Sequence, residues 1–302
     1  MNTSKNFEVI IIGGSYSGLS AAMALGRSLR KVLIIDSSLP CNRQTPQSHN
    51  FITQDGATPI EISQKAKSQT LKYDTISFIE DTAVKGKKIN DTFQIITASG
   101  KEFITKKLIF ATGIKDIMPA IKGFSDCWGI SVVHCPYCHG YEIKNKKTGI
   151  IANGDTAFHL APLVKNLTSN LSILTRGKAE FNTEQIAKLN KNKIKIIEKE
   201  ITEIEHENGH IKNVIFKDNS KESFEATYAS VPFKQHSDIP KLLGCELDEQ
   251  GYIQVDMTYK TTIEGVYACG DNCSKIRSVS NAVASGNMAG AIINMELTKE
   301  QF

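Results

Sequence analysis

The sequence has no long apolar run and no strong excess of charge. None of its apolar stretches approaches the roughly 18 residues that a membrane-spanning helix needs, and residues 1–7 are polar, without the apolar core and cleavage site of a secretory signal. Lys and Arg number 36 against 32 for Asp and Glu, and the net charge of +4 is spread along the chain. We therefore expect a cytoplasmic protein with neither a nucleic-acid nor a membrane partner.

Disulfide-framework spacing is also missing, apart from one pair of cysteines. A reducing compartment would keep the other cysteines as thiols, and we expect each to be a small buried hydrophobic residue. These cysteines are Cys41, Cys127, Cys245, Cys269 and Cys273. The chain has 302 residues, of which 40% are hydrophobic, so one or two domains with a substantial core are expected.

The remaining two cysteines stand at redox spacing in the segment His134-Cys135-Pro136-Tyr137-Cys138-His139-Gly140. Two thiols separated by two residues can close a small disulfide. Pro136 favours the start of a helix, which would place both sulfurs near the positive end of its dipole and lower a thiol pKa. The segment therefore indicates thiol–disulfide chemistry.

Two other interpretations of this segment stay open. The flanking histidines could complete a zinc site, although four ligands drawn from six consecutive residues give poor tetrahedral geometry, and no second ligand pair stands elsewhere. The two thiols could also be buried and inert. We therefore expect no metal site, and the redox interpretation is a hypothesis that depends on the rest of the chain.

The first part of the chain has the pattern of a nucleotide-binding unit. The apolar run Phe7–Ile12 is typical of a buried parallel strand, Gly13–Gly18 forms a glycine-rich turn, and Leu19–Leu29 has a helical pattern. Such a turn directs backbone N–H groups and a helix N-terminus toward a pyrophosphate. Ser15 replaces the middle glycine of the usual G-x-G-x-x-G pattern.

An acidic residue supports the same interpretation. The apolar strand Val32–Ile35 ends in Asp36, at the distance from Gly13 where a carboxylate would accept hydrogen bonds from the adenosine ribose. The alternative is an α/β unit that binds nothing. The polar, turn-rich segment Pro40–Gly56 could form a lid over a cofactor.

Further elements follow up to the middle of the chain. Ile60–Leu71 has an amphipathic helical pattern, and short alternating segments then indicate a β-meander that leads into a buried strand. These segments are Ser77–Val84, Thr92–Ala98, Glu102–Ile104 and the buried strand Leu108–Ala111. Thr112-Gly113 closes that strand, and we place a crossover to a second domain near Met118-Pro119.

The second domain repeats the strand–turn–helix–strand order. Its segments are Thr148–Ala152, Asn153–Thr156, Ala157–Val164 and Leu171–Leu174, followed by the helix Thr183–Leu189 and the strand Ile194–Ile197. Asn208-Gly209 is typical of a type I′ turn joining Ile201–Ile204 to Val214–Phe216. Pro240 marks the return to the first domain. A helical pattern over Val279–Glu296 contains Gly286 and Gly290, which suggest close backbone packing.

Taken together, these motifs resemble the low-molecular-weight, FAD-containing thioredoxin reductases from end to end. The resemblance rests on four motifs in the family's order: Gly13-Gly14-x-x-x-Gly18, Ala111-Thr112-Gly113, Cys135-x-x-Cys138, and Thr262-x-x-x-x-Tyr267-Ala268-x-Gly270-Asp271. The centre is similar to the subgroup with Cys-Pro-Tyr-Cys-His-Gly-Tyr-Glu. That subgroup includes fungal and bacterial dithiol oxidases, which close disulfides in small natural products.

The resemblance implies an α/β fold with two Rossmann-like, three-layer nucleotide-binding domains of the pyridine nucleotide-disulfide oxidoreductase type. Residues 1–115 and 241–302 would form a discontinuous FAD-binding domain. Residues 116–240 would form an NAD(P)H-type domain that carries the redox cysteines. The family also implies FAD as cofactor, a homodimer, and a thioredoxin-like protein or a small dithiol or disulfide as substrate.

The resemblance also implies roles for single residues. Asp36 would hold the adenosine ribose and Asp271 the ribitol, while Cys138 would face the flavin and Cys135 the substrate. His139 stands where the family usually has an aspartate and would exchange protons, unless it only caps or packs a helix. The full set of FAD-binding residues implied is Gly13, Gly14, Ser15, Ser17, Gly18, Asp36, Arg43, Gln44, Asn50, Val84, Ala111, Thr112, Gly113, Gly270, Asp271 and Ala282. Of these, Gln44, Asn50 and Thr112 would line the flavin.

Three departures from the family pattern bear on the electron donor. Ala152 replaces the first glycine of the second fingerprint, and Thr175-Arg176-Gly177 replaces the cluster that binds the 2′-phosphate of NADPH, although Lys178 could substitute for a missing arginine. Ser280-Asn281 stands where an Arg-Gln pair is expected, with Arg277 nearby. The residues left for a nicotinamide nucleotide are Gly154, Asp155, Thr156 and Arg176. NADPH is therefore a doubtful cofactor.

The leading prediction is a FAD-dependent thiol-disulfide oxidoreductase that passes electrons between FAD and the Cys135–Cys138 pair, and between that pair and a protein or small-molecule thiol. The alternatives are an oxygen-dependent dithiol oxidase and a non-catalytic sensor whose disulfide state alters a partner interaction. The sequence leaves the direction of electron flow open.

Overall fold

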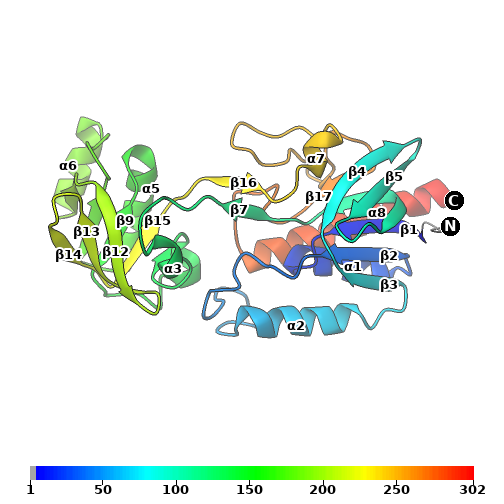
Figure 1. Cartoon of the computed structure of the whole chain (residues 1–302), viewed down its shortest axis with the longest axis horizontal. Coiled ribbons are helices and arrows are strands. Elements are labelled where there is room, and N and C mark those ends of the chain that lie inside the picture. Colours follow the sequence, from blue (N-terminus) through cyan, green and yellow to red (C-terminus); the bar gives the residue numbers. More distant parts are fainter. Residues whose placement is uncertain (1–4) are drawn as a thin grey trace. The chain divides into compact units, whose positions relative to one another are not determined.

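The computed structural model describes residues 5–302 and divides them into two compact units. Unit 1 contains the described residues up to Arg43, then Ala57–Lys115 and Phe233–Phe302; unit 2 contains Gln44–Gly56 and Asp116–Pro232. Figure 1 shows the blue, cyan and red segments of unit 1 interleaved, although they come from the two ends of the sequence. The mixed α/β fold with parallel sheets is confirmed.

Two segments fall in a different unit from the one the sequence suggested. Residues 44–56 belong to unit 2, where the Gln44 side chain donates a 2.7 Å hydrogen bond to Trp128 O. Residues 233–240 belong to unit 1, where Ile239 is buried in a core cluster with Phe93 and Ile95. These side-chain contacts determine the unit in which each segment packs. The domain boundaries predicted from turn residues miss these contacts, because a turn residue carries no information about packing elsewhere in the chain.

Unit 1 is built on a seven-stranded sheet in the order β3-β2-β1-β6-β5-β4, with β17 paired to β6. Its helices and strands are β1 (Lys5–Ile12), α1 (Tyr16–Arg27), β2 (Val32–Asp36), α2 (Pro59–Thr70), β3 (Ile76–Glu80), β4 (Ala83–Ile89), β5 (Thr92–Thr97), β6 (Glu102–Phe110), α7 (Ile239–Leu242), β17 (Val266–Ala268) and α8 (Val279–Gln301). The short strands β7 (Ile114–Asp116) and β16 (Phe233–Gln235) pair with each other.

The parallel strands of unit 1 are buried on both faces, which explains their continuous apolar runs. On β1, Ile10 and Ile12 enter one core cluster, while Val9 and Ile11 enter another. The first cluster is completed by side chains of the β4–β5 meander and the second by side chains of α1 and α8. Unit 1 therefore has three layers: helices, a parallel sheet and an antiparallel meander.

The meander differs from the sequence expectation in two ways. Residues 77–84 form two strands instead of one: β3 pairs parallel with β2, and β4 pairs antiparallel with β5. The break comes at Asp81, whose N–H donates to Asp36 O and whose carboxylate accepts from Ser99. Conversely, residues 102–104 and 108–110 lie on one strand, β6, because β1 pairs with it from Phe103 to Phe110.

Unit 2 has the same three-layer plan on a five-stranded parallel sheet, β11-β10-β9-β15-β8. Side chains of α5 and α6 complete the core on one face, and side chains of the three-stranded β12-β13-β14 sheet complete it on the other. Its elements are α3 (Phe124–Cys127), β8 (Val132–Val133), α4 (Pro136–His139), β9 (Thr148–Ile151), α5 (Gly154–Lys165), β10 (Leu171–Leu174), α6 (Thr183–Lys191), β11 (Lys195–Ile197), β12 (Ile201–Glu207), β13 (His210–Phe216), β14 (Lys221–Ser223) and β15 (Ala226–Ala229).

Two local predictions are confirmed by backbone geometry. Asn208 and Gly209 have φ values of 50° and 79°, as a type I′ turn between β12 and β13 requires. A side chain at Gly286 would collide with the backbone of Ser17, and one at Gly290 would lie 2.6 Å from Ala21 O. These two glycines therefore permit the close packing of α8 on α1.

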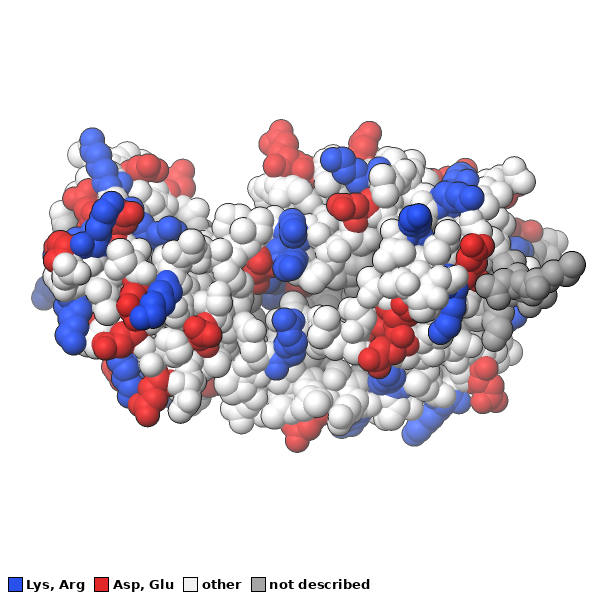
Figure 2. Space-filling model, viewed as in Figure 1, with Lys and Arg blue, Asp and Glu red and all other residues white. Residues whose placement is uncertain are grey.

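The surface agrees with the composition. Figure 2 shows basic and acidic side chains interspersed on the visible face, without a field of one sign. Among residues 5–302, no helix is both long and apolar enough to cross a membrane. Of the five cysteines expected to be buried, Cys127, Cys245 and Cys269 are buried and Cys273 is partly buried, whereas Cys41 is exposed because it lies in the polar turn after β2.

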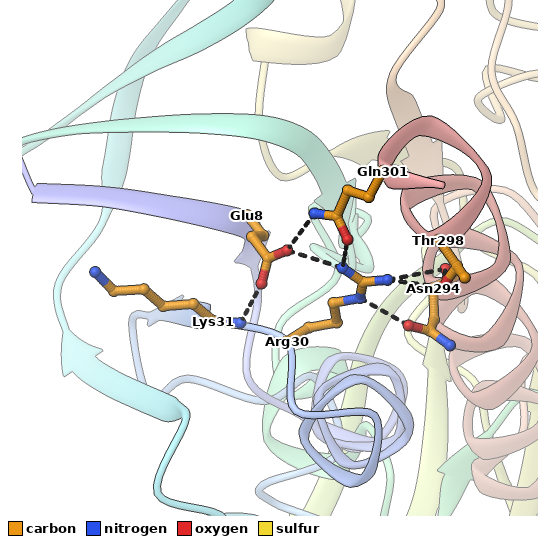
Figure 3. A network of polar contacts seen from close by, with 6 residues as sticks. All are labelled: Glu8, Arg30, Lys31, Asn294, Thr298 and Gln301. Carbon is orange, nitrogen blue, oxygen red and sulfur yellow. Dashed lines mark hydrogen bonds and ion pairs between the residues drawn. The ribbon is translucent and has the colours of Figure 1, made fainter.

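One buried arginine fastens the C-terminal helix to the start of the sheet (Figure 3). Arg30 is 8% exposed, and its guanidinium donates to Glu8 on β1 at 2.9 Å. On α8 it also donates to the side chains of Asn294, Thr298 and Gln301 at 2.7, 2.7 and 2.6 Å. Because these partners come from segments far apart in the sequence, the network closes unit 1 around its discontinuous chain.

We expect Arg30→Met to lower the free energy of unfolding by about 2 kcal/mol, because it leaves the carboxylate of Glu8 partly buried without its cation. Arg27→Met is the matched control: Arg27 is exposed and donates a 3.1 Å hydrogen bond to the Tyr73 hydroxyl. It should change stability by about 0.5 kcal/mol or less. Chemical denaturation of both variants measures the difference, and equal effects would contradict the role given to Arg30.

Candidate functional site

The carboxyl ends of the parallel strands in unit 1 form one edge at which many of the predicted cofactor residues gather. Strands β1, β2, β6 and β17 run parallel, so the residues that follow them lie at the same edge of the sheet. Those residues are Gly13-Gly14, Asp36, Ala111-Thr112-Gly113 and Gly270-Asp271. In open α/β sheets ligands bind at this edge, where strand order reverses; here β2 lies on one side of β1 and β6 on the other.

Glycines before and at the start of α1 allow the main chain of this turn to pack closely against neighbouring main-chain atoms. A Cβ at Gly13 would collide with Ala111 O, and one at Gly18 would collide with Gly13 O. Gly13 also has φ +106°, which side-chain-bearing residues rarely adopt. Ser15 is the N-cap of α1 but makes no side-chain cap hydrogen bond, so its side chain leaves the first-turn N–H groups available to a ligand. A cradle of this shape fits a pyrophosphate.

Asp36 holds the glycine turn from the end of β2. Its carboxylate accepts a 2.7 Å hydrogen bond from Gly14 N and a 3.0 Å bond from Ser38 N. The carboxylate retains further acceptor capacity, which suits a ribose diol. The chain that leads to Val84 passes nearby, because Asp81 N donates to Asp36 O at 2.9 Å.

The second part of the edge is formed by the Gly270-Asp271 turn. Gly270 has φ +84°, its N–H donates to Ser285 Oγ at 3.0 Å, and a Cβ there would lie 2.7 Å from Ser17 Oγ. Asn272 is fully buried and donates to Phe110 O at 2.8 Å. Ser285 and Asn272 were missed by the sequence analysis, because a lone Ser or Asn carries no signal without the fold.

Three further residues that the sequence motifs indicated lie outside the Gly270-Asp271 turn itself. Arg277 Nε lies 3.9 Å from Asp271 Oδ2, so the Ser280-Asn281 substitution leaves an arginine beside the motif. Ala282 packs with Tyr16 and Ile62 in a small core cluster. The Arg43 side chain is exposed and donates to Pro40 O at 3.1 Å, a contact within its own turn.

In unit 2, Cys135 and Cys138 are joined in a disulfide, with a Cα–Cα distance of 5.3 Å. Pro136 begins α4, as the sequence predicted, and Cys135 is the N-cap residue. Cys135 Sγ accepts a 3.1 Å hydrogen bond from Cys138 N. This bond would stabilise a thiolate on Cys135 once the disulfide is reduced, because an N–H donor lowers a thiol pKa. The disulfide also leaves neither sulfur free to bind zinc in this state.

His139 follows Cys138 and is partly buried. Burial lowers the pKa of His139 below its ordinary value; the negative charge of Glu142 acts against this shift, and the charge of His49 adds to it. Neither Glu142 nor His49 is a site residue that the sequence motifs predict. Glu142 belongs to the Cys-Pro-Tyr-Cys-His-Gly-Tyr-Glu segment, but His49 lies in the turn-rich segment 44–56, which gave no sign that it packs in unit 2.

Two residues expected to line the flavin also lie in segment 44–56. Gln44 bonds Trp128 O, and Asn50, with φ +61°, donates its N–H to Asp55 Oδ1 at 2.7 Å. Both contacts lie within unit 2. Their role toward the flavin stays a prediction.

The second glycine turn differs from the first because a side chain occupies it. Asn153 Oδ1 accepts hydrogen bonds from Gly154 N at 2.9 Å and from Glu180 N at 3.0 Å, and Asn153 Nδ2 donates to Lys178 O at 2.9 Å. Asp155, in the first turn of α5, accepts from Gln185 at 2.7 Å. Of the other residues expected here, Thr156 and Arg176 are exposed.

Two nucleotide-binding turns on parallel sheets and a redox-spaced disulfide define a class, the disulfide oxidoreductases with two nucleotide-binding units. The model of the pyridine nucleotide-disulphide oxidoreductase family matches residues 7–286. The chain belongs to this family. It is a FAD-dependent disulfide oxidoreductase of the thioredoxin reductase type, and the glycine cradle of unit 1 fits the FAD that this type requires.

Relatives match along nearly the whole chain. The thioredoxin reductase tcpT of Claviceps purpurea (strain 20.1) is 30% identical over 308 residues, which cover 98% of this chain and 96% of the relative. A solved oxidoreductase from Agrobacterium tumefaciens is 34% identical, with a TM-score of 0.91 and coverage of 97% and 99%. The structure of TrxB from Bacillus anthracis is 29% identical, with a TM-score of 0.93 and coverage of 98% and 100%.

Proposed function

We propose that the chain moves an electron pair between FAD, held by unit 1, and the Cys135–Cys138 pair of unit 2, and between that pair and a substrate thiol or disulfide. The observation that carries this proposal is the closed Cys135–Cys138 disulfide beside His139, in a chain whose other unit retains an open glycine cradle. FAD supplies a store for two electrons. The protein residues bind it, exchange disulfides and move protons.

The cofactor would be held by the strand ends of unit 1. The N-terminus of α1 and its glycines would receive the pyrophosphate, and Asp36 would accept hydrogen bonds from the ribose. Asp271 lies on the same edge, where a ribitol hydroxyl could donate to its carboxylate. The remaining residues of the predicted set, including Thr112, Val84 and Ala282, are proposed contacts on the same basis.

At the disulfide the two sulfurs would have different roles. A substrate thiolate attacks Cys135 Sγ, a mixed disulfide forms and the Cys135–Cys138 bond breaks. The second substrate thiol then closes the substrate disulfide and releases Cys135. The substrate loses two electrons and two protons, and the cysteine pair gains both. The reverse sequence reduces a substrate disulfide by the same bonds.

The substrate would be a small dithiol or disulfide, or the dithiol of a thioredoxin-like protein, because relatives along the whole chain are named thioredoxin reductases. We further propose a homodimer, as the family resemblance implies. A cytoplasmic location fits the buried thiols of Cys127 and Cys245, which a reducing compartment would preserve.

Trapping tests the proposed roles of the two sulfurs. In Cys138→Ser the lone Cys135 should accumulate a mixed disulfide with an added small thiol disulfide, found on its peptide by mass spectrometry. In Cys135→Ser the lone Cys138 should accumulate several-fold less. Cys127 is the internal control and should stay unmodified, because burial raises its pKa to about 11. An adduct mainly on Cys138 would reverse the assignment.

A second candidate, an oxygen-dependent dithiol oxidase, is favoured by the occupied turn at Asn153. The N–H group of Gly154 is one that a pyrophosphate would use, and the Asn153 side chain already accepts it. Glu180 adds negative charge there, since its Oε2 lies 3.9 Å from the position of a Cβ on Gly154. In this version the electrons taken from a dithiol leave through FAD to oxygen.

We therefore expect NADPH to be a poor reductant. Loss of one guanidinium from a phosphate clamp weakens binding by about ten- to a hundredfold, and Ala152 and Asn153 crowd the turn further. The measurement is anaerobic mixing of the oxidised enzyme with NADPH or NADH while flavin absorbance is followed. Ala152→Gly/Asn153→Gly should be reduced faster than the wild type. Full reduction of the wild type within roughly a second at about micromolar NADPH would contradict the expectation.

A further inference from the structure

A polar cluster lies beside the disulfide and has no part in the mechanism described so far. It contains Glu142 after α4, His49 and Asp55 from the segment 44–56, and Tyr228 on β15. All of these residues belong to unit 2. Tyr228 pairs with Val133, the last residue of β8, so β15 lies beside the strand that leads into the cysteine motif.

The backbone places Glu142 near His139. Helix α4 ends at His139, and the chain continues in turns in which Gly140 N donates to Pro136 O at 2.9 Å and Lys144 N donates to Tyr141 O at 3.4 Å. Glu142 lies in these turns, three residues after His139, and its charge acts on the His139 imidazole.

His49 holds that carboxylate in place. Its Nε2 lies 3.5 Å from Glu142 Oε1 and its Nδ1 lies 3.6 Å from Asp55 Oδ1. The side chain of His49 is 16% exposed, whereas that of Glu142 is 38% exposed. The imidazole of His49 thus bridges two carboxylates, which fixes the position of Glu142 relative to α4.

The groups that face His139 act on its charge in opposite directions. Burial lowers the pKa of His139, the anion of Glu142 opposes that shift, and His49 reinforces it. Tyr228 contributes no charge, because burial and the nearby Glu142 raise its pKa well above the ordinary value. Its Oη is buried and has no hydrogen-bond partner in the part of the chain that the structure describes. Glu142 is therefore the group that favours a protonated His139.

We propose that Glu142, held by His49, is a positioning residue that lets His139 take the proton of the attacking thiol at the Cys135–Cys138 disulfide. The proposal rests on the proposed function and adds residues to it. The thiol proton moves to the imidazole of His139 as the new S–S bond forms, and from there to the thiolate of Cys138 as the old bond breaks. No further oxidant or reductant is needed for this step.

The direct test is the pH titration of His139 by NMR in the full-length, FAD-loaded protein with labelled histidine, with His139→Gln to assign the signal. Glu142→Gln should move the titration midpoint to lower pH by roughly half a unit or more, because an anion is lost. Glu184→Gln is the matched control: Glu184 pairs with Lys188 on α6, and its loss should leave the midpoint unchanged.

The pH dependence of dithiol exchange with the disulfide supplies a second readout. The limb assigned to His139 should shift to lower pH in Glu142→Gln and return toward the wild type in Glu142→Asp. A midpoint that stays fixed in Glu142→Gln while exchange is intact would overturn this proposal alone. Absence of dithiol exchange in the wild type would overturn the proposed function, and the role given to Glu142 with it.

Discussion

The edge of the unit 1 sheet that would hold the cofactor depends on close main-chain packing at glycine positions, where no side chain intervenes. Gly13 and Gly18 bring the start of α1 against the end of β6, and Gly286 and Gly290 bring α8 against the same helix. A methyl group at any of these positions would collide with a main-chain oxygen or carbon. The helix N-terminus is thereby fixed at the strand ends, and the Arg30 network holds α8 in that arrangement.

Unit 2 repeats this plan with a different result. Its three-layer architecture survives, but Asn153 fills the turn with its own amide and ties it to residues 178 and 180. The reactive groups of unit 2 lie elsewhere: the disulfide and His139 belong to the short helix α4, and Glu142 follows in the turn after it. The same fold thus serves as a ligand cradle in one unit and as a scaffold for thiols in the other.

Much of this could be predicted from the sequence, because the signals were local. Apolar runs, Asn208-Gly209 and Pro136 each determine their own backbone conformation, and the strand, turn and helix they indicate are present. What failed depends on contacts between distant segments. The polar residues Thr105 to Lys107 are typical of a break, yet β6 runs through them because β1 pairs with this stretch, and the buried Lys107 is neutralised by Glu300 on α8. Similarly, nothing in segment 44–56 indicates that His49 would contact Glu142.

The central claim is that the Cys135–Cys138 pair and FAD belong to one electron-transfer system. An anaerobic titration of the oxidised holoenzyme with a strongly reducing dithiol, counting electrons per chain, tests it most directly. The account predicts uptake of about four electrons, two by the disulfide and two by FAD, and about two in a Cys135→Ser/Cys138→Ser variant reduced by a dye. Complete reduction of the disulfide by the dithiol with the flavin still oxidised, at about two electrons per chain, would contradict it.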